Sequence, residues 1–320
     1  MKKKYYLTLD TETATVPWAD EYAKEDAKIK QKIAIAKPLV YDIGWVITDR
    51  QGAIVKKVNY LVQETFFVPN VFNTAYYKEK RPIYMELLAK GEISAKTWND
   101  IIDELEKDLE MVDITTAYNA CFDFKKAIPF TERYIKALYS PNYQAWEDYQ
   151  KSRTKSLVNG EKDSKESNPE YLKPYFELRD KKYPLADLWG IACERLININ
   201  KYKNYCLENK LLTNSKIYFK SSAETSFQYL MKQHDFIEDH TALSDALIES
   251  KILTKALKKG KVEPYLQAFP FKELGYTYDY VLNKKQKYKE EFAESLKEYY
   301  DTLDKMTAWG KRIERIVAMF

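Results

Sequence analysis

The chain has 320 residues, of which 45% are hydrophobic and 31% charged, and its formal net charge at pH 7 is +4. This length and composition are ordinary for a globular protein with a full core, made of one large domain or of a domain with additions. The small net charge excludes a strong basic field over the whole chain, so any nucleic-acid contact must come from local patches.

Membrane-spanning and disulfide-rich classes are also disfavoured. No run approaches the roughly 18 apolar residues that span a bilayer, so we expect no membrane partner. The three cysteines, Cys121, Cys193 and Cys206, lack the spacing of a metal site or of a disulfide framework. They fit a reducing environment, and we expect a cytoplasmic protein.

The first half of the chain predicts a mixture of strands and helices. Residues 4–10 predict a strand, and the Ala, Lys, Glu and Ile content of 19–36 predicts a helix within a long connection over 13–38. Two further strands are expected at 39–48 and 53–62, joined by a hairpin at 50–52. The remaining elements are helical pieces at 70–90 broken at Pro82, a helix at 97–111, a strand at 114–118 and a helical stretch at 123–139 that is restarted or kinked at Pro129.

The second half starts with a polar segment over 141–182, in which Ser, Lys, Glu and Asn dominate. This composition predicts an insertion that is mobile near 155–169. Regular structure is expected to resume with a strand at 183–188, which is followed by helices at 188–209, 221–233 and 242–258.

Four carboxylates and one histidine in three short motifs suggest a two-metal phosphodiesterase site. Asp10 and Glu12 come at the end of the first strand, where residues two apart point the same way and can face one metal ion. Asp123 opens a helix in the second motif, and His240 and Asp245 form the third. Carboxylate oxygens suit Mg²⁺ or Mn²⁺ rather than zinc, and a histidine can take a proton from water near neutral pH.

Each motif also has a purely structural interpretation when it is taken alone. An Asp-x-Glu pair arises easily in a chain with 48 acidic residues. Asp123 can be a helix cap, and His240 can be an ordinary surface or core histidine. The three motifs together are more specific than any one of them.

The order and contexts of these motifs resemble the DEDDh family of 3′–5′ exonucleases, the family of polymerase proofreading subunits, RNase T and oligoribonuclease. The resemblance covers roughly residues 4–258, and it includes the Ile43-Gly44 pair of the second strand and Asp187 of the last strand. The residues that match the three family motifs are Asp10, Glu12 and Thr13, then Asn119, Phe122 and Asp123, and finally His240, Ala242, Asp245 and Ala246.

The resemblance implies an α/β, ribonuclease-H-like fold with a mixed five-stranded sheet flanked by helices, and the expected order of elements fits it. The exonuclease domain would cover residues 1–262, with insertions at 13–38 and 141–182. Residues 263–320 would form a helical C-terminal extension.

The resemblance also implies how the site residues share the chemistry. Asp10, Glu12 and Asp245 would hold one divalent cation, while Asp10 and Asp123 would hold a second. His240 would be the general base that generates the attacking hydroxide.

The expected substrate is a single-stranded nucleic acid with a free 3′ end, from which 5′-mononucleotides are released, with DNA favoured over RNA. Thr13 and Asn119 would lie near the terminal nucleotide. Phe122 would either stack on a base or belong to the core.

Two other functions stay open. An RNA-trimming exoribonuclease shares the motifs, because the pocket that meets the 2′-hydroxyl is not visible in the sequence. A non-catalytic nucleic-acid-binding or replication scaffold module can share the fold, although such modules usually lose a metal ligand and here all five positions are filled.

The C-terminal tail carries a heptad-like apolar seam. A seam of this kind predicts a helix that either packs on the core or docks on a second copy or a partner such as a polymerase. Its members are Phe292, Leu296, Tyr299, Leu303, Met306, Ile313, Val317 and Phe320.

Overall fold

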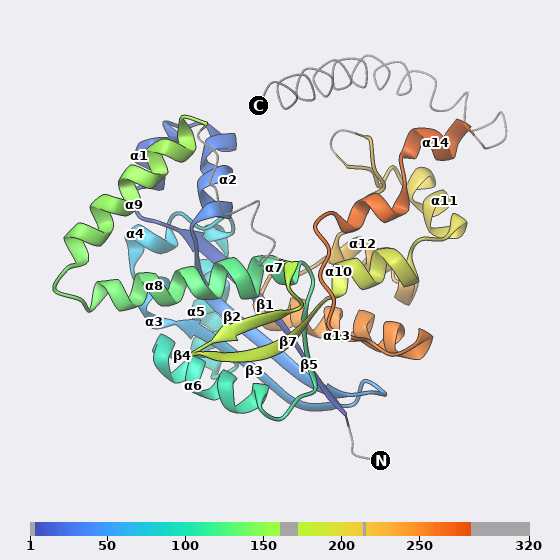
Figure 1. Ribbon diagram of the computed structural model, residues 1–320, viewed down its shortest axis with the longest axis horizontal. Coiled ribbons are helices and arrows are strands. Elements are labelled where there is room, and N and C mark those ends of the chain that lie inside the picture. Colours follow the sequence, from blue (N-terminus) through green and yellow to red (C-terminus); the bar gives the residue numbers. More distant parts are fainter. Residues whose placement is uncertain (1–3, 161–171, 214–215, 283–320) are drawn as a thin grey trace.

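The structure, a computed structural model, describes residues 4–160, 172–213 and 216–282 (Figure 1). The strands are β1 Tyr5–Thr15, β2 Pro38–Asp49, β3 Ile54–Val62, β4 Ser94–Lys96, β5 Ile114–Ala117, β6 Tyr175–Leu178 and β7 Lys181–Asp187. The α-helices are α1 Ala19–Ala23, α2 Ala27–Ala36, α3 Gln63–Phe66, α4 Pro69–Phe72, α5 Arg81–Lys90, α6 Trp98–Leu109, α7 Ala120–Phe122, α8 Ile128–Leu138, α9 Tyr143–Val158, α10 Leu188–Ile191, α11 Asn200–Glu208, α12 Ala223–Met231, α13 Ala242–Lys259 and α14 Thr277–Leu282. Short 3₁₀ segments cover Lys78–Lys80 and Pro270–Leu274, and π-helical segments cover Asp123–Ala127 and Ala192–Leu196.

The strands form one mixed sheet in the order β4-β3-β2-β1-β5-β7-β6. Strand β2 is antiparallel to β1 and β3, whereas β5 runs parallel to β1 and β7 runs parallel to β5. The expected α/β sheet flanked by helices is confirmed, but the expected five strands are wrong, because the sheet has seven. The two edge strands gave little sequence signal, since β4 has only three residues and β6 lies within the polar segment 141–182.

The sheet separates two apolar cores, because alternate side chains of a strand point to opposite faces. Leu7 and Leu9 of β1 belong to the first core, and Tyr6 belongs to the second. Helices α6 and α8 contribute to the first core, while α10 to α13 contribute to the second. In Figure 1 the central strands accordingly lie between α8 and α6 on the left and α13 and α12 on the right.

Both insertions differ from their expectations. The helix expected at 19–36 is two helices, α1 and α2, because Lys24 and Glu25 between them take left-handed φ angles of 45° and 68°. The second insertion holds α9 and β6, and α9 includes residues 155–158, which we expected to be mobile. Helices α1, α2 and α9 pack together (Figure 1), with Lys32 Nζ donating to the Leu157 carbonyl at 2.7 Å.

The two interruptions expected at prolines coincide with helix starts. Pro82 lies in the first turn of α5 and Pro129 in the first turn of α8, where the missing proline N–H costs nothing. The helix expected at 188–209 is interrupted between the π-helical segment and α11.

Residues after α13 return to the sheet. The Tyr265 N–H donates to the Leu185 carbonyl at 3.0 Å, and the Asp187 N–H donates to the Tyr265 carbonyl at 2.7 Å. The division at residue 262 and the seam at 292–320 stay predictions, because most of the extension lies outside the described residues. Among the helices of the described ranges, none is long and apolar enough to cross a membrane.

Candidate metal centre

Strand β1 carries the first motif on the face that meets α13. Asp10 pairs with Gly44 of β2, and Glu12 pairs with Asp42, so the two carboxylates lie on one face as expected. The register then shifts, since Thr13 pairs with Val40. Such a bulge redirects the following side chains, and bulges are common beside active sites.

The second motif turns sharply from β5 into a helical run. Asn119 takes a left-handed φ of 74°, and its N–H donates to Asp187 Oδ1 at 3.0 Å. The helical run begins at Ala120, so Asp123 lies one turn inside it and is not the helix cap that we weighed as an alternative. The Asp123 carboxylate accepts the Thr11 hydroxyl of β1 at 2.6 Å, which fixes it beside the first motif.

The third motif precedes and opens α13. Thr241, a residue type that often caps helices, stands at the N-cap position, but its side chain makes no capping hydrogen bond. Asp42 of β2 replaces it, because its Oδ2 accepts the Ala242 N–H at 2.9 Å. This bond anchors the start of α13 to the sheet, and the buried Asp245 follows within the first turn.

The structure brings the first and third motifs into direct contact. Ligand atoms of Glu12, His240 and Asp245 all lie within 4.8 Å of one another. His240 Nδ1 is 3.8 Å from Asp245 Oδ2. Within the described residues, the buried Asp245 Oδ1 has no hydrogen-bond partner. A buried oxygen without such a partner is available to coordinate a cation.

Burial and mutual repulsion raise the pKa of every carboxyl group in this cluster. The pKa of Asp10 lies well above its ordinary value because of burial and then the charges of Glu249 and Asp123. Burial, followed by the charge of Asp245, likewise raises the pKa of Glu12. Burial raises the pKa of Asp123 to about 7 and, together with Glu238, that of Asp245 to about 8.

His240 shows the opposite shift. Its pKa is lowered by burial and by the nearby charge of Lys80. The imidazole is therefore neutral at pH 7 and can accept a proton. The other histidine of the chain, His234, is exposed and contacts Tyr205.

Comparison with family models, curated proteins and solved structures found no match for this chain. The site must therefore be interpreted from its own residues.

Two acidic residues of the site were missed by the sequence analysis. Glu249 is buried one turn after Asp245 on α13, accepts the Tyr118 N–H at 3.1 Å, and exerts the largest charge effect on Asp10. Asp42 is fully buried and also accepts the Tyr84 hydroxyl at 3.0 Å. Both could have been recognised in the sequence, because each is an acidic residue within an otherwise apolar strand or helix face, and buried acids are rare.

The three residues expected near the substrate lie in different settings. Thr13 is half-buried at the β1 bulge, and Asn119 is exposed at its turn. Phe122 is half-buried and packs against the first core, so the core role that we left open for it is present in the structure.

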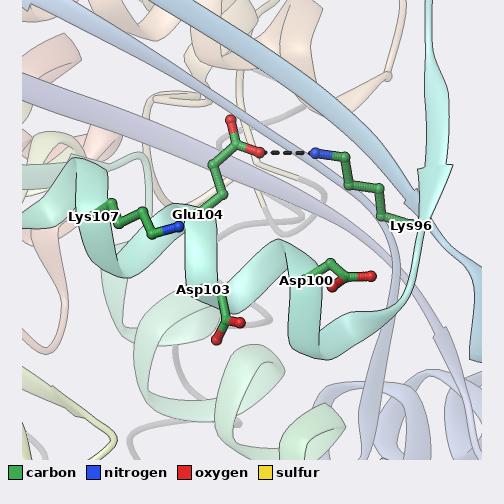
Figure 2. Close-up of a pocket in the computed structure, with 5 residues that line it drawn as sticks. All are labelled: Lys96, Asp100, Asp103, Glu104 and Lys107. Atoms are coloured by element: carbon green, nitrogen blue, oxygen red, sulfur yellow. Dashed lines mark hydrogen bonds and ion pairs between the residues drawn. The ribbon is translucent and has the colours of Figure 1, made fainter.

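A separate hollow on the surface of α6 and β4 contrasts with this cluster (Figure 2). Glu104 forms an ion pair with Lys96 at 2.9 Å, and Asp103 forms one with Arg179. Burial acts to raise the pKa of Glu104, but hydrogen bonds from Lys96, Lys56 and Tyr60 outweigh it and hold the pKa at about 2. Glu104 of this hollow therefore has a lowered pKa, in contrast to the raised pKa values of the carboxyl groups in the candidate metal centre. Its lining residues are Lys96, Asp100, Asp103, Glu104 and Lys107.

Proposed function

We propose that this chain is a metal-dependent 3′–5′ exonuclease of the DEDDh type, which releases 5′-mononucleotides from single-stranded nucleic acid. The observation that carries the proposal is the meeting of Glu12, His240 and Asp245, from motifs more than 220 residues apart, within 4.8 Å. Asp10 and Asp123, the other two residues of the pattern, are close enough to perturb the same carboxyl groups.

The sheet order supports the same proposal. Strands β3-β2-β1-β5-β7, with β2 antiparallel to its neighbours, follow the order expected of a ribonuclease-H-like sheet. In that arrangement β1 is central. Asp10 lies in the middle of β1, because the strand runs on to Thr15, past its expected end at residue 10, but it lies beyond Thr8, where the pairing with β5 ends. Strands β4 and β6 are then additions at the two edges.

The donor set fits divalent cations. Asp10, Glu12 and Asp245 would hold one ion, and Asp10 and Asp123 a second, because oxygen-only carboxylate sets suit Mg²⁺ or Mn²⁺. When bound, such ions activate water and neutralise charge on the phosphate. The raised pKa values and the unpaired Asp245 Oδ1 agree with carboxylates arranged for a positive charge.

The chain's own residues would then move one proton. Neutral His240 accepts a proton from the water that attacks the phosphorus of the terminal nucleotide. The new bond joins that water oxygen to phosphorus, and the bond from phosphorus to the 3′ oxygen of the preceding nucleotide breaks. The leaving 3′ oxygen is protonated from solvent, and general-base help of this kind contributes typically about 10²–10⁴-fold to the rate.

A second role for His240 is favoured by one observation. Its ring nitrogen lies within the same 4.8 Å group as two carboxylates, so it can also serve as a metal ligand. Calorimetry with Mn²⁺ separates the roles: a general base predicts that His240→Ala keeps the metal affinity and loses turnover. If His240 is a metal ligand, the same variant should lose metal affinity as well as turnover.

The test of the function is cleavage by purified protein of three labelled substrates: single-stranded DNA, duplex DNA and RNA. Each is incubated with Mg²⁺, with Mn²⁺ and with EDTA. The proposal predicts stepwise shortening from the 3′ end of unpaired strands, abolished by EDTA. Tight binding of single strands without cleavage in either metal would instead support the non-catalytic module, and cleavage of RNA alone would support the exoribonuclease.

A further inference from the structure

The segment between α4 and α5 reaches the third motif from a distant part of the sequence. The ring of Tyr77 stacks on that of His240, with centroids 4.5 Å apart and planes inclined by 13°. Lys80, on the following turn, donates a hydrogen bond to the backbone carbonyl of Asp239. The histidine and the residue before it are therefore both held from the same segment.

His240 needs such support because of its backbone. Its φ of 47° is left-handed, a conformation that residues other than glycine adopt uncommonly. Residues 236–241 belong to no helix or strand, so no ladder of backbone hydrogen bonds fixes them. The backbone is held on either side, where the Glu238 N–H donates to Glu224 and the Asp245 N–H donates to the Thr241 carbonyl, and the side-chain contacts of His240 add to these bonds.

We propose that Tyr77 and Lys80 form a clamp that positions the His240 imidazole against the carboxylates, an inference that rests on the proposed role of His240. Stacking sets the plane of the ring, and the bond to Asp239 holds the backbone that leads into it. The two parts support each other, since Lys80 Nζ lies 4.8 Å from the centre of the Tyr77 ring.

The clamp aims His240 Nδ1 at the metal centre. This nitrogen lies 3.8 Å from Asp245 Oδ2 and 3.7 Å from Glu238 Oε2. Tyr77 and Lys80 are thus positioning residues, which act through the histidine.

Proton magnetic resonance of the metal-free full chain tests the clamp without any activity. The chain has two histidines, and the variant His234→Gln assigns the signals of His240. Ring current from a stacked tyrosine shifts the His240 ring protons upfield. We expect this shift in the wild type and in Tyr77→Phe, and its loss in Tyr77→Ala. A His240 signal that is unchanged in Tyr77→Ala would overturn the clamp.

Steady-state kinetics provide the second readout. A small misplacement of a reacting group can cost about 100-fold in rate, so Tyr77→Ala and Lys80→Met should lower kcat about 10- to 100-fold with little change in KM. The Tyr77→Phe variant keeps the aromatic ring and should therefore retain the wild-type kcat. The matched controls are the exposed residues Tyr139 and Lys78, and Tyr139→Ala and Lys78→Met should keep the wild-type kcat.

A change in KM rather than in kcat would contradict the inference. A raised KM at constant kcat would mean that Tyr77 or Lys80 binds the nucleic acid directly. If the wild type cleaves nothing, the proposed function fails, while the resonance experiment still decides whether the clamp exists.

Discussion

Gly44 of β2 lies directly against the backbone of Leu243 at the start of α13. A Cβ atom on Gly44 would stand 2.4 Å from the Leu243 nitrogen, closer than any real contact of that kind. The absence of a side chain at this position lets the helix that carries Asp245 approach the strand that pairs with Asp10.

The variant Gly44→Ala tests this close approach. The added methyl group meets backbone rather than a flexible side chain, so α13 must move away, and overpacking of this kind typically costs about 1–3 kcal/mol. We expect a lower melting temperature and, because Asp245 shifts with the helix, a weaker metal affinity. Gly260→Ala is the control, since a Cβ there meets nothing within 4 Å. Equal stability of the two variants would contradict the packing argument.

The Asp42 anchor makes a second prediction. Replacing Asp42 by Ala leaves the Ala242 N–H and the Tyr84 hydroxyl without their acceptor, a loss of about 1–3 kcal/mol for a buried donor. Asp42→Asn keeps an acceptor oxygen and should lose much less. Urea unfolding of both variants measures the difference. If the two lose the same amount, the hydrogen bonds to Asp42 do not hold α13.

The raised pKa values predict how stability depends on pH. A carboxyl group whose pKa is raised on folding contributes stability that is present below its unfolded pKa near 4 and is lost as pH rises through the folded value. For Asp245 that value is about 8 and for Asp123 about 7, so the metal-free protein should lose stability from these groups between about pH 4 and pH 8.

Asp245→Asn isolates one of these groups. Relative to wild type in EDTA, the variant should gain stability as pH rises across this window, by up to about 1.4 kcal/mol per pH unit for one proton. Urea titrations at pH 5.5 and pH 8 measure the change. If the difference in unfolding free energy between variant and wild type is the same at both pH values, folding does not raise the pKa of Asp245.

Glu249 provides a test on a residue outside the three motifs. Glu249→Gln removes a charge that opposes Asp10 and Asp123 but keeps an acceptor for the Tyr118 N–H. We expect a higher melting temperature of the metal-free protein at pH 8. Glu249→Ala removes the acceptor as well and should be destabilised. A Gln variant that melts below wild type would mean that the Glu249 charge has a stabilising partner.

Local patterns predicted much of this structure. The alternating apolar residues of 39–62 predicted the β2–β3 hairpin, and the apolar face of 97–111 predicted α6 behind its Thr97 cap. The three motifs also predicted that residues from β1, the turn after β5 and α13 would meet. The strands and helices depend on residues that are near one another in sequence. The meeting of the three motifs was expected because their order resembles that of a family with the same motifs.

The remaining features depend on tertiary contacts. No local pattern shows that Asp42 caps α13 in place of Thr241, because the two are joined only when the helix packs on β2. The stacking of Tyr77 on His240 is of the same kind. Edge strand β6 is stabilised by pairing with β7, although its own surroundings in the sequence are polar.

The most direct measurement of the central claim is single-turnover cleavage of a 5′-labelled oligonucleotide by wild type and Asp245→Asn, with products identified by mass. The account predicts that wild type with Mg²⁺ or Mn²⁺ releases 5′-mononucleotides from the 3′ end. It also predicts that Asp245→Asn loses this release by at least about 100-fold while remaining folded. Near-normal cleavage by Asp245→Asn, or products cut within the strand, would contradict the account.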